Sequence, residues 1–508
     1  MRNLVLAAVS ATSVFASMPA RAIEFVNALR IPNIITGAND ANRFGGFGSD
    51  LVYNPADGLY YGMTDRGPGG GLLDYAPRIQ SFSLDVATNG TISNFAARAP
   101  IIFTRDGVAF SGQNPGLLAG DKAALGRSFD PEGLAIRSNG NFIVSDEYGP
   151  SIYEFDSQGR YIRAFTIPAN LLPKQADGTP NYVDGRPTIT SGRQDNRGFE
   201  GLTLSNDGTK AYAILQDPLV NDGPVNGGEA QGRRGQNLRI VEFDVATGAA
   251  TAQFAYTLES IADINGRIPG TANDFTATQQ GRSIGVSSIT QLPDGRFLVI
   301  ERDNRGWGVD DTANRLPIGS KRVYIVDKTG ATDISNLSLA GLSALPLGVT
   351  AVNKGTQPFL DIQALLAAAG VPIVEKMEGL AFSPMLADGG RALFIISDND
   401  FSVTQFDGSS TQFEYCSSGP EANAVSFTPA LGTPCPAGTA LIPTFLYSFK
   451  LSATEAAALG FATSAVPEPA SWAMMIGGLG LVGGAMRRRR VKFGSRNGSF
   501  YRERKAVS

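Results

Sequence analysis

Histidine is absent from all 508 residues of this chain. A histidine general base, a Ser-His-Asp triad, a histidine-ligated zinc ion and the mechanism of histidine phosphatases are therefore excluded. Any hydrolysis by this protein has to use carboxylates, hydroxyls and arginines, together with a hard metal ion held by oxygen atoms.

Cysteine is almost as scarce, because Cys416 and Cys435 are the whole complement. If the chain is exported, an oxidising compartment favours a disulfide between them, and two free thiols are the alternative. Closing a loop of about 20 residues stabilises the fold by roughly 3 kcal/mol in the chain-entropy treatment. Neither cysteine has a basic partner nearby in the sequence that would make it a nucleophile.

Basic residues are under-represented in the body of the chain. Residues 23–466 hold 32 basic and 45 acidic residues, a formal net charge of −13. Such an acidic body argues against nucleic acid as a partner. It also means that a small anionic substrate needs a cation between itself and the protein.

The first 22 residues have the order of a signal peptide. Arg2 supplies the basic start, residues 4–15 are apolar or small, and Ala20-Arg21-Ala22 fits a cleavage site. A short buried helix is the alternative interpretation. The pattern predicts export.

The C-terminal end has a second export pattern. After a linker at residues 456–466, Pro467-Glu468-Pro469 precedes 17 apolar or small residues (470–486), four arginines (487–490) and a basic tail at residues 491–508. The apolar run is long enough for a short transmembrane helix, and the arginines fit its cytoplasmic end. Residues 467–490 resemble the PEP-CTERM sorting signal, which implies an exosortase-type enzyme as a partner and a membrane-anchored precursor. We therefore expect a protein of the periplasm or outer cell envelope, or a secreted one.

Between the two ends, five segments repeat one plan of strand, Asp-Gly or Asn-Gly turn, and strand. They lie at residues 48–65, 131–147, 199–217, 286–301 and 377–398. Most are followed by a second hairpin, and four antiparallel strands per repeat are typical of a β-propeller blade. We predict an all-β propeller over residues 23–455, with five legible repeats and six blades possible. A β-sandwich is the competing all-β fold.

The sequence also predicts how the ring closes, where insertions lie and where a helix forms. The strand at residues 23–31 is expected to pair with residues 444–451 and close the ring. Residues 216–237 and 333–376 are expected insertions, and residues 359–369 form the best helix candidate. Gly281 to Gly285 match G-x-S-x-G, but a strand follows and no histidine exists, so we do not expect a nucleophile elbow.

Acidic residues recur at fixed places in the repeats. Glu132, Glu200 and Glu378 open first strands, and acids close second strands. The closing acids are Asp65, Asp146 with Glu147, Asp217, Glu301 and Asp398. The start of the first strand and the end of the second share one face of a propeller, so most of these acids are expected at one mouth of the channel. Converging carboxylates without histidine or cysteine favour calcium, with magnesium or manganese as second choices. The alternative is that they cap backbone groups or pair between blades.

Several local motifs together resemble the phytase-like family, described as having esterase-like activity of phytase. These are Asp65-Arg66-Gly67, Glu132-Gly133-Leu134-Ala135, Ser145-Asp146-Glu147-Tyr148-Gly149, Asn196-Arg197-Gly198-Phe199-Glu200-Gly201-Leu202 and Glu378-Gly379-Leu380-Ala381. The resemblance implies a propeller hydrolase of phosphoric or carboxylic esters that uses calcium. The Glu-Gly openings are also similar to gluconolactonase-type propellers, where residues at these positions hold one divalent cation.

Taken together, these patterns predict an exported, calcium-dependent ester hydrolase. The expected metal ligands are Glu132, Glu200, Glu378, Asp65 and Asp398. Asp146 or Glu147 is the expected base, and Arg66 and Arg302 are expected to bind the substrate anion. Arg197 and Arg305 lie beside the same positions. The alternatives are a non-catalytic binding propeller of the envelope or matrix, and a lactonase.

Overall fold

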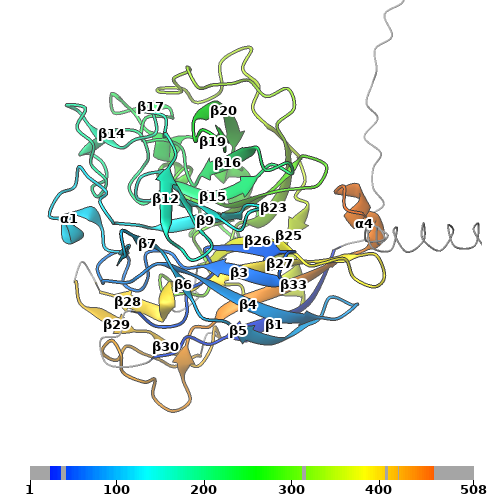
Figure 1. Ribbon diagram of the computed structural model, residues 1–508. Helices are drawn as coiled ribbons and strands as arrows, with labels where there is room; N and C mark the ends of the chain where they lie inside the picture. The colour runs from blue at the N-terminus through cyan, green and yellow to red at the C-terminus, as the bar shows by residue number, and fades with distance from the viewer. Residues whose placement is uncertain (1–22, 36–41, 312–315, 407–409, 422, 463–508) are drawn as a thin grey trace, which may run out of the picture. The chain divides into compact units, whose positions relative to one another are not determined.

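Antiparallel sheets make up most of the regular structure in the computed structural model, which describes residues 23–35, 42–311, 316–406, 410–421 and 423–462. Five of its sheets each contain a path of four strands (Figure 1). The first three are β2(Asp50–Asn54)-β3(Leu59–Met63)-β4(Arg78–Val86)-β5(Ile92–Ala97), β9(Pro131–Ile136)-β10(Phe142–Asp146)-β11(Ser151–Phe155)-β12(Tyr161–Ala164) and β15(Phe199–Leu204)-β16(Lys210–Leu215)-β19(Asn237–Asp244)-β20(Ala250–Thr257). The last two are β21(Ile284–Gln291)-β22(Phe297–Asp303)-β23(Lys321–Asp327)-β24(Asn353–Lys354) and β26(Lys376–Phe382)-β27(Arg391–Asp398)-β33(Thr444–Leu451)-β1(Glu24–Ile31).

The first strands of these sheets form a closed ring. β2 contacts β9, β9 contacts β15, β15 contacts β21, β21 contacts β26, and β26 returns to β2. The fold is therefore a β-propeller, and its described part has five blades. The sixth blade that the repeat spacing left open is not found in this part of the chain, because the extra residues form insertions within and between the five blades.

The ring is closed by the N-terminal strand, as the sequence predicted. β1 pairs antiparallel with β33, with Leu29 opposite Leu446 and Ile31 opposite Thr444. The last blade is thus built from both ends of the body, which ties the first and last segments into one sheet. In this pairing β1 covers the outer edge of β33 and becomes the outermost strand of the blade.

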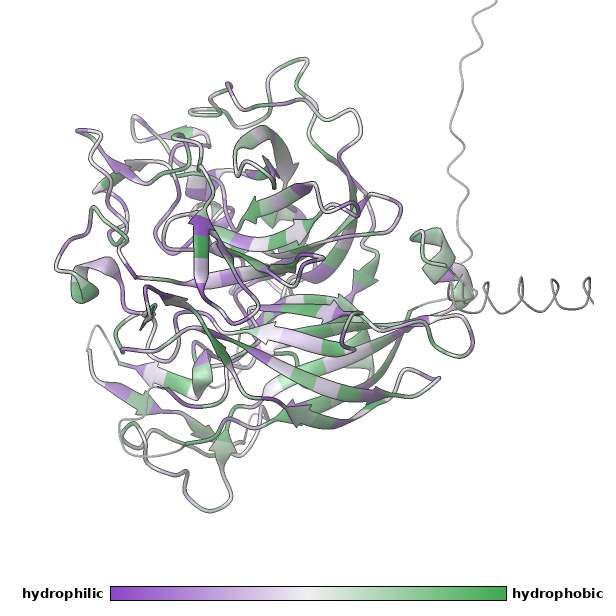
Figure 2. Ribbon diagram, viewed as in Figure 1, coloured by the Kyte–Doolittle hydropathy of each residue, from purple (hydrophilic) through white to green (hydrophobic). Residues whose placement is uncertain are grey.

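The strands form where apolar residues alternate between tight turns. Gly58 and Gly140, in the first two hairpin turns, have φ of 73° and 84°, a conformation that favours glycine. Figure 2 shows hydrophobic residues recurring along the strands. Between the second and third blades, the side chains of Ile143, Phe199 and Leu202 are fully or almost fully buried in one cluster. Burial of each such side chain stabilises the fold by about 1.5–3 kcal/mol.

The expected insertions are present. The segment at residues 216–237 carries β17(Val225–Asn226) and β18(Glu229–Ala230), and the segment at residues 333–376 carries β24, β25(Leu360–Asp361) and α3(Ile362–Ala368). The helix α3 lies inside the expected range of residues 359–369, and Asp361 caps its first turn through a hydrogen bond from the Ala364 amide.

A further insertion, at residues 399–443, was not expected. The predicted disulfide between Cys416 and Cys435 lies in it. A fully buried ion pair fixes the insertion to the first part of the chain, because Arg43 donates to both oxygens of Glu414 at 2.6 and 2.7 Å. The insertion therefore packs on the propeller instead of hanging from it.

The propeller body ends at Phe461. The short helix α4(Ala453–Ala458) follows the last strand, and the Phe461 ring lies 4.7 Å from the Phe382 ring of β26. The expected signal peptide at residues 1–22, the PEP-CTERM segment at residues 467–490 and the basic tail at residues 491–508 lie outside the described residues, as do residues 463–466 of the expected linker. Within the described ranges, no helix is long and apolar enough to cross a membrane.

Candidate functional site

A cavity of about 430 Å³ lies where the first strands begin and the second strands end. Ten carboxylates and five cationic side chains line it, a formal net charge of −5. Of the nine predicted site residues, eight line this cavity. They are Asp65, Arg66, Glu132, Glu147, Glu200, Arg302, Glu378 and Asp398. Carboxylates far apart in the sequence therefore gather at one mouth of the channel.

The three glutamates point inward because of β-bulges. Glu132, Glu200 and Glu378 are each the extra residue on the first strand, left unpaired between neighbours that keep their partners on the second strand. A bulge of this kind re-aims a side chain and is common beside active sites. In the fourth blade the same position is taken by Ser287.

The glycine after each glutamate allows neighbouring blades to touch. A Cβ added to Gly133 would lie 2.5 Å from the Leu202 amide nitrogen, and one on Gly201 would lie 2.6 Å from that of Ile289. A Cβ on Gly379 would lie 2.7 Å from the Leu51 amide nitrogen. The repeated Glu-Gly pair thus has two roles, since the glutamate enters the cavity and the glycine closes the ring around it.

The acids at the second-strand ends divide into two groups. Asp65, Asp217 and Asp398 line the cavity. Glu301 does not line it, because its carboxylate accepts hydrogen bonds from Tyr256 and Lys354 at 2.5 Å each, away from the cavity. Successive side chains on a strand point to opposite sides, so the next residue, Arg302, faces the cavity instead.

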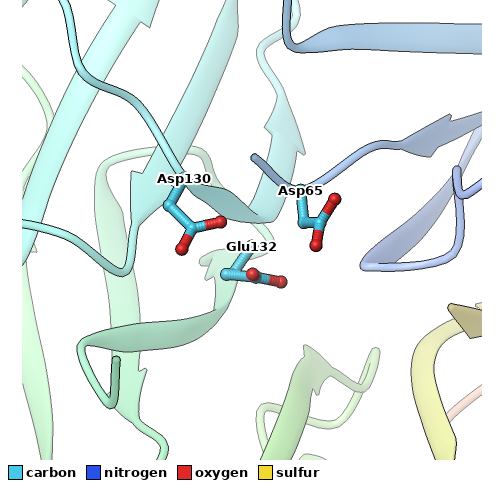
Figure 3. A group of neighbouring side chains, drawn as sticks. All are labelled: Asp65, Asp130 and Glu132. Atoms are coloured by element: carbon cyan, nitrogen blue, oxygen red, sulfur yellow. The ribbon is translucent and has the colours of Figure 1, made fainter. Parts of the chain in front are cut away.

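One acidic group joins the first and second blades. Oxygens of Asp65, Asp130 and Glu132 lie within 4.8 Å of one another, and Figure 3 shows the three carboxylates turned toward a shared space. Arg66 neutralises part of this charge, because its backbone amide and its Nη1 each donate to Asp130 at 2.9 Å. The group still holds more carboxylates than cations.

Burial and mutual repulsion raise the pKa values of this group. Burial raises the pKa of Asp130 to about 7, although Arg66 opposes the shift. The pKa of Glu132 lies well above its usual range because of burial and the nearby carboxylates of Glu200, Asp130, Glu378 and Glu147. Buried carboxylates with raised pKa values either stay protonated or are stabilised in their ionised form by a bound cation.

A second acidic group shares Asp65. Its other members are Asp398 and Asp400, again with oxygens within 4.8 Å of one another. Here the Lys376 ammonium already supplies a positive charge, at 2.5 Å from Asp400 and 3.5 Å from Asp398. Burial raises the pKa of Asp398 to about 7. The lysine makes this group the poorer of the two for a metal ion.

Several buried oxygens at the cavity have no hydrogen-bond donor. They are Glu147 Oε1, Glu200 Oε2, Asn196 Oδ1, Gln216 Oε1 and Asp398 Oδ1. Leaving such an oxygen without a partner costs about 1–3 kcal/mol. An all-oxygen set of carboxylates and amides fits a hard cation such as calcium. The donor chemistry of the cavity therefore agrees with the metal class predicted from the sequence.

The two expected anion-binding arginines are already engaged by protein groups. Arg66 pairs with Asp130, whereas Arg302 donates through Nε to Ser287 at 2.6 Å and through Nη2 to Glu378 at 2.5 Å. Arg305 lies outside the cavity, with its guanidinium 3.6 Å from the centre of the Phe275 ring. The positive charge of Arg302 is therefore compensated by a glutamate of the protein. Arg302 holds glutamates in place and is poorly suited to bind a substrate anion.

Asp146, expected as a base, lies behind the cavity wall. Its carboxylate accepts hydrogen bonds from the Asp130 and Gly149 amides at 2.8 Å and from the Ser151 hydroxyl at 2.6 Å. Glu147, the next residue, lines the cavity, and its Oε1 lies 4.0 Å from Nη1 of Arg197. Of the two carboxylates, only Glu147 is placed to reach a bound molecule.

Sequence reasoning missed several residues of the site. Asp130 could have been found, because it stands two residues before Glu132 in an extended segment and so shares its side. Lys376 stands in the same relation to Glu378. Arg282, inside the discounted G-x-S-x-G match, lines the cavity, and Asp400 reaches it only because the unexpected insertion begins there.

The chain is similar to known proteins in both its sequence and its fold. The family model named Phytase-like, described as "Esterase-like activity of phytase", matches residues 42–401. The PEP-CTERM protein-sorting motif matches residues 465–490. A relative from Arthroderma benhamiae, named "Uncharacterized secreted protein", is 30% identical over 468 residues, covering 75% of this chain and 87% of the relative. The sorting motif and the secreted relative both indicate export.

Two solved structures illustrate the structural similarity. A luciferin-regenerating enzyme is 11% identical, with 83% of this chain and 95% of that chain covered and a TM-score of 0.30. A virginiamycin B lyase from Staphylococcus aureus is 9% identical, with 84% and 98% covered and a TM-score of 0.27. Neither similarity bears on function.

Proposed function

Because this chain belongs to the phytase-like family, we propose that it is an exported, calcium-dependent hydrolase of phosphoric or carboxylic esters. The observation that carries the proposal is the cavity itself, in which buried carboxylate and amide oxygens without donors surround a volume large enough for a small substrate. A purely structural set of acids would be expected to have its oxygens satisfied by donors.

The cation would be held by Asp65, Asp130 and Glu132, with Glu200 and Glu378 on neighbouring blades facing the same cavity. A bound calcium ion would polarise an ester oxygen and lower the pKa of a bound water. Because β2 of the first blade contacts β9 of the second and the three carboxylates come from both blades, cation binding would also link these blades.

Glu147 is our candidate for the general base. It is the first residue after β10, it lines the cavity, and its buried Oε1 has no hydrogen-bond donor. Arg197, 4.0 Å away, would orient the carboxylate. The carboxylate of the preceding residue, Asp146, accepts hydrogen bonds from Asp130, Gly149 and Ser151 and so holds the backbone around Glu147 in place.

Arg302 is a positioning residue in this proposal. Its guanidinium lies between two glutamates, 2.5 Å from Glu378 and 3.7 Å from Glu200, and its Nε bonds to Ser287. The fourth blade has Ser287 at the position where the second, third and fifth blades have a glutamate, and the smaller side chain leaves room for Arg302. Arg302 thereby orients Glu200 of the third blade and Glu378 of the fifth.

The location follows from the two ends of the chain. The sorting motif implies processing by an exosortase-type enzyme, and the apolar run within it would anchor the precursor in a membrane until then. The mature protein would act in the periplasm, in the outer cell envelope or after secretion.

The test is a hydrolase screen on purified protein, stripped of metal and then reloaded with calcium. The screen contains p-nitrophenyl phosphate, p-nitrophenyl acetate and a lactone. We expect ester turnover with calcium, loss of turnover without it, and loss in Glu200→Gln but not in Glu242→Gln, which changes a carboxylate on β19 outside the cavity. Calcium binding without turnover of any substrate would instead identify a binding propeller, and turnover of the lactone alone would identify a lactonase.

A further inference from the structure

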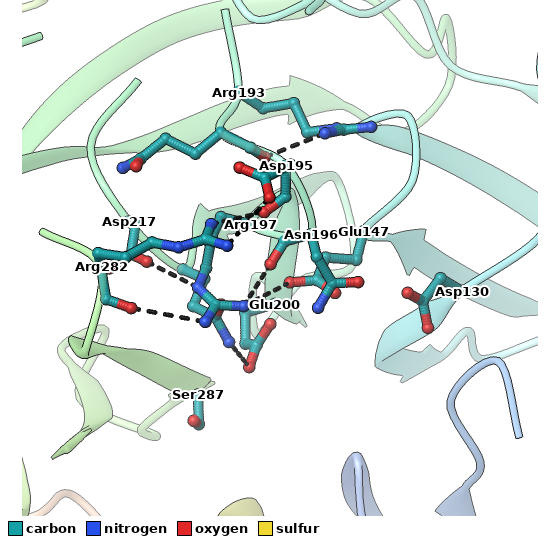
Figure 4. A network of polar contacts seen from close by, with 12 residues as sticks. Asp130, Glu147, Arg193, Asp195, Asn196, Arg197, Glu200, Asp217, Arg282 and Ser287 are labelled. Atoms are coloured by element: carbon teal, nitrogen blue, oxygen red, sulfur yellow. Dashed lines mark hydrogen bonds and ion pairs between the residues drawn. The ribbon is translucent and has the colours of Figure 1, made fainter. Parts of the chain in front are cut away.

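Two arginines stand close together at the cavity, and the proposed function uses only Arg197, which orients Glu147. Arg197 stands two residues before β15 of the third blade, and Arg282 stands two residues before β21 of the fourth. Figure 4 shows their guanidinium groups beside each other. Both line the cavity, with 21% and 32% of their side chains exposed.

The positive charges of Arg197 and Arg282 repel each other, so their proximity is unfavourable unless another group compensates it. Burial lowers the pKa of Arg282, and the neighbouring charge of Arg197 lowers it further. An anion between the two guanidinium groups would remove this repulsion. Arg66 and Arg302 differ from Arg197 in the nitrogen that is paired: they contact the buried carboxylates of Asp130 and Glu378 through a terminal nitrogen, whereas buried Asp217 contacts Arg197 through Nε.

The carboxylates that face this pair leave it accessible. Arg282 donates through Nη1 to the Asp195 carbonyl oxygen at 2.6 Å and through Nη2 to the 40% exposed Asp195 carboxylate at 3.1 Å, so each terminal nitrogen keeps a second N–H. Asp217 contacts Nε of Arg197 at 2.9 Å, and Glu147 lies 4.0 Å from its Nη1. Asp195, Asp217 and Glu147 thus orient the two arginines while their guanidinium groups stay at the cavity surface.

The segment that carries Arg197 is rigidly held. Arg193 is 1% exposed and donates to the carbonyl oxygens of Tyr148 and Tyr182 at 2.6–2.9 Å. Gln194 Nε2 donates to the carbonyl oxygen of Gly281 at 2.7 Å and so connects this segment to the residue before Arg282. The positions of the two arginines are therefore set before any ligand arrives, which lowers the entropic cost of binding.

We propose that Arg197 and Arg282 form the subsite for the phosphoryl oxygens of a phosphate monoester. Guanidinium groups bind phosphoryl oxygens through paired hydrogen bonds, whereas a neutral carboxylic ester offers no anionic group to such a pair. The inference rests on the proposed function and narrows its substrate class. Calcium at the acidic wall and the arginine pair on the facing segment would hold the substrate from two sides.

The test compares Arg282→Gln with Arg282→Lys and with Arg267→Gln as a matched control. Arg267 is similarly exposed, at 28% of its side chain, pairs with Glu259 and lies outside the cavity. For Arg282→Gln we expect at least a tenfold rise in KM for p-nitrophenyl phosphate and in the inhibition constant of inorganic phosphate. Turnover of p-nitrophenyl acetate should change by less than twofold. Arg282→Lys keeps the charge without the paired donors and should lie in between.

Equal losses on the phosphate and acetate esters, or an unchanged inhibition constant for phosphate, would overturn the subsite. Calorimetric titration of calcium-loaded protein with inorganic phosphate separates this result from failure of the proposed function, because it requires no turnover. If no ester is hydrolysed, phosphate binding that is lost in Arg282→Gln still supports the subsite, and binding that is absent or unchanged refutes it. Melting curves of each variant confirm that the fold is retained.

Discussion

The metal-free protein is expected to lose stability as the pH rises from 5 to 7. Burial raises the pKa values of Asp130 and Asp398 to about 7, against an ordinary value of 3.8. Between these values the folded state holds protons that the unfolded chain has released. Stability is then fully present below the unfolded pKa and is lost as the pH rises through the folded pKa.

The size of the effect follows from proton linkage. Each carboxyl that is protonated only in the folded state contributes a slope of about 1.4 kcal/mol per pH unit. The two aspartates together contribute at most roughly 3 kcal/mol per pH unit between pH 5 and 6, and Glu132, whose pKa is also raised, acts in the same sense. Carboxyls with lowered pKa values, such as Glu154 and Asp207, act in the opposite sense, but they titrate below this window.

Calcium is expected to reverse this pH dependence. The ion binds ionised carboxylates, so it displaces the protons and binds more tightly at pH 8 than at pH 6. At a free concentration 100 times the dissociation constant it would stabilise the fold by about 2.7 kcal/mol. The difference between calcium-loaded and metal-free protein should therefore grow as the pH rises.

Urea denaturation followed by tryptophan fluorescence measures both effects. The protein is stripped on a chelating resin, because soluble chelators bind calcium in a pH-dependent way, and is then examined from pH 5 to 8 with and without calcium. Glu132→Gln removes one ionisable group from the acidic cluster and should flatten the metal-free slope and reduce the calcium effect, whereas Glu242→Gln should behave as wild type. A metal-free stability that is constant or rises from pH 5 to 7 would refute the reasoning.

Three other outcomes are expected. Glu147→Gln should lower kcat by about 100-fold or more with an unchanged melting temperature, as loss of a general base does, and an unchanged kcat would remove this residue from the mechanism. Gly201→Ala should destabilise the fold by about 1–3 kcal/mol in urea denaturation, because the added Cβ meets backbone of the next blade, whereas Gly266→Ala has only ordinary contacts and serves as the control. Arg43→Met should cost about 3–5 kcal/mol by leaving Glu414 buried without its partner, and the double variant with Glu414→Leu should cost less; an equal or larger loss in the double variant would contradict this view of the pair.

Much of the fold is readable from the sequence because its signals are local and repeated. Turn glycines such as Gly58 and Gly140, with alternating apolar residues around them, specify hairpins without reference to distant segments. The pairing of residues 23–31 with residues 444–451 could also be inferred, since a ring of blades leaves both ends of the body with unpaired edges. The number of blades could not be read from spacing alone, because insertions and blades lengthen the sequence in the same way.

The candidate site was predictable in composition but not in orientation. The repeated Glu-Gly pairs identified Glu132, Glu200 and Glu378 as members of one group. Within the adjacent pairs, however, strand alternation and blade contacts decide that Glu147 faces the cavity and Asp146 does not. The sequence presents both members of such a pair equally.

The amino-acid sequence by itself determined that any catalysis has to proceed without histidine, and that a repeated hairpin brings distant acids to one mouth. Only the tertiary structure decided which acids meet and which cations are already engaged. Asp400 reaches the cavity through an insertion fixed by the buried Arg43–Glu414 pair, and Arg66 and Arg302 are taken up by Asp130 and Glu378. The physical reason is that residue type and spacing are local properties, whereas burial and ion pairing depend on contacts between segments that, in these three pairs, lie 64 to 371 residues apart.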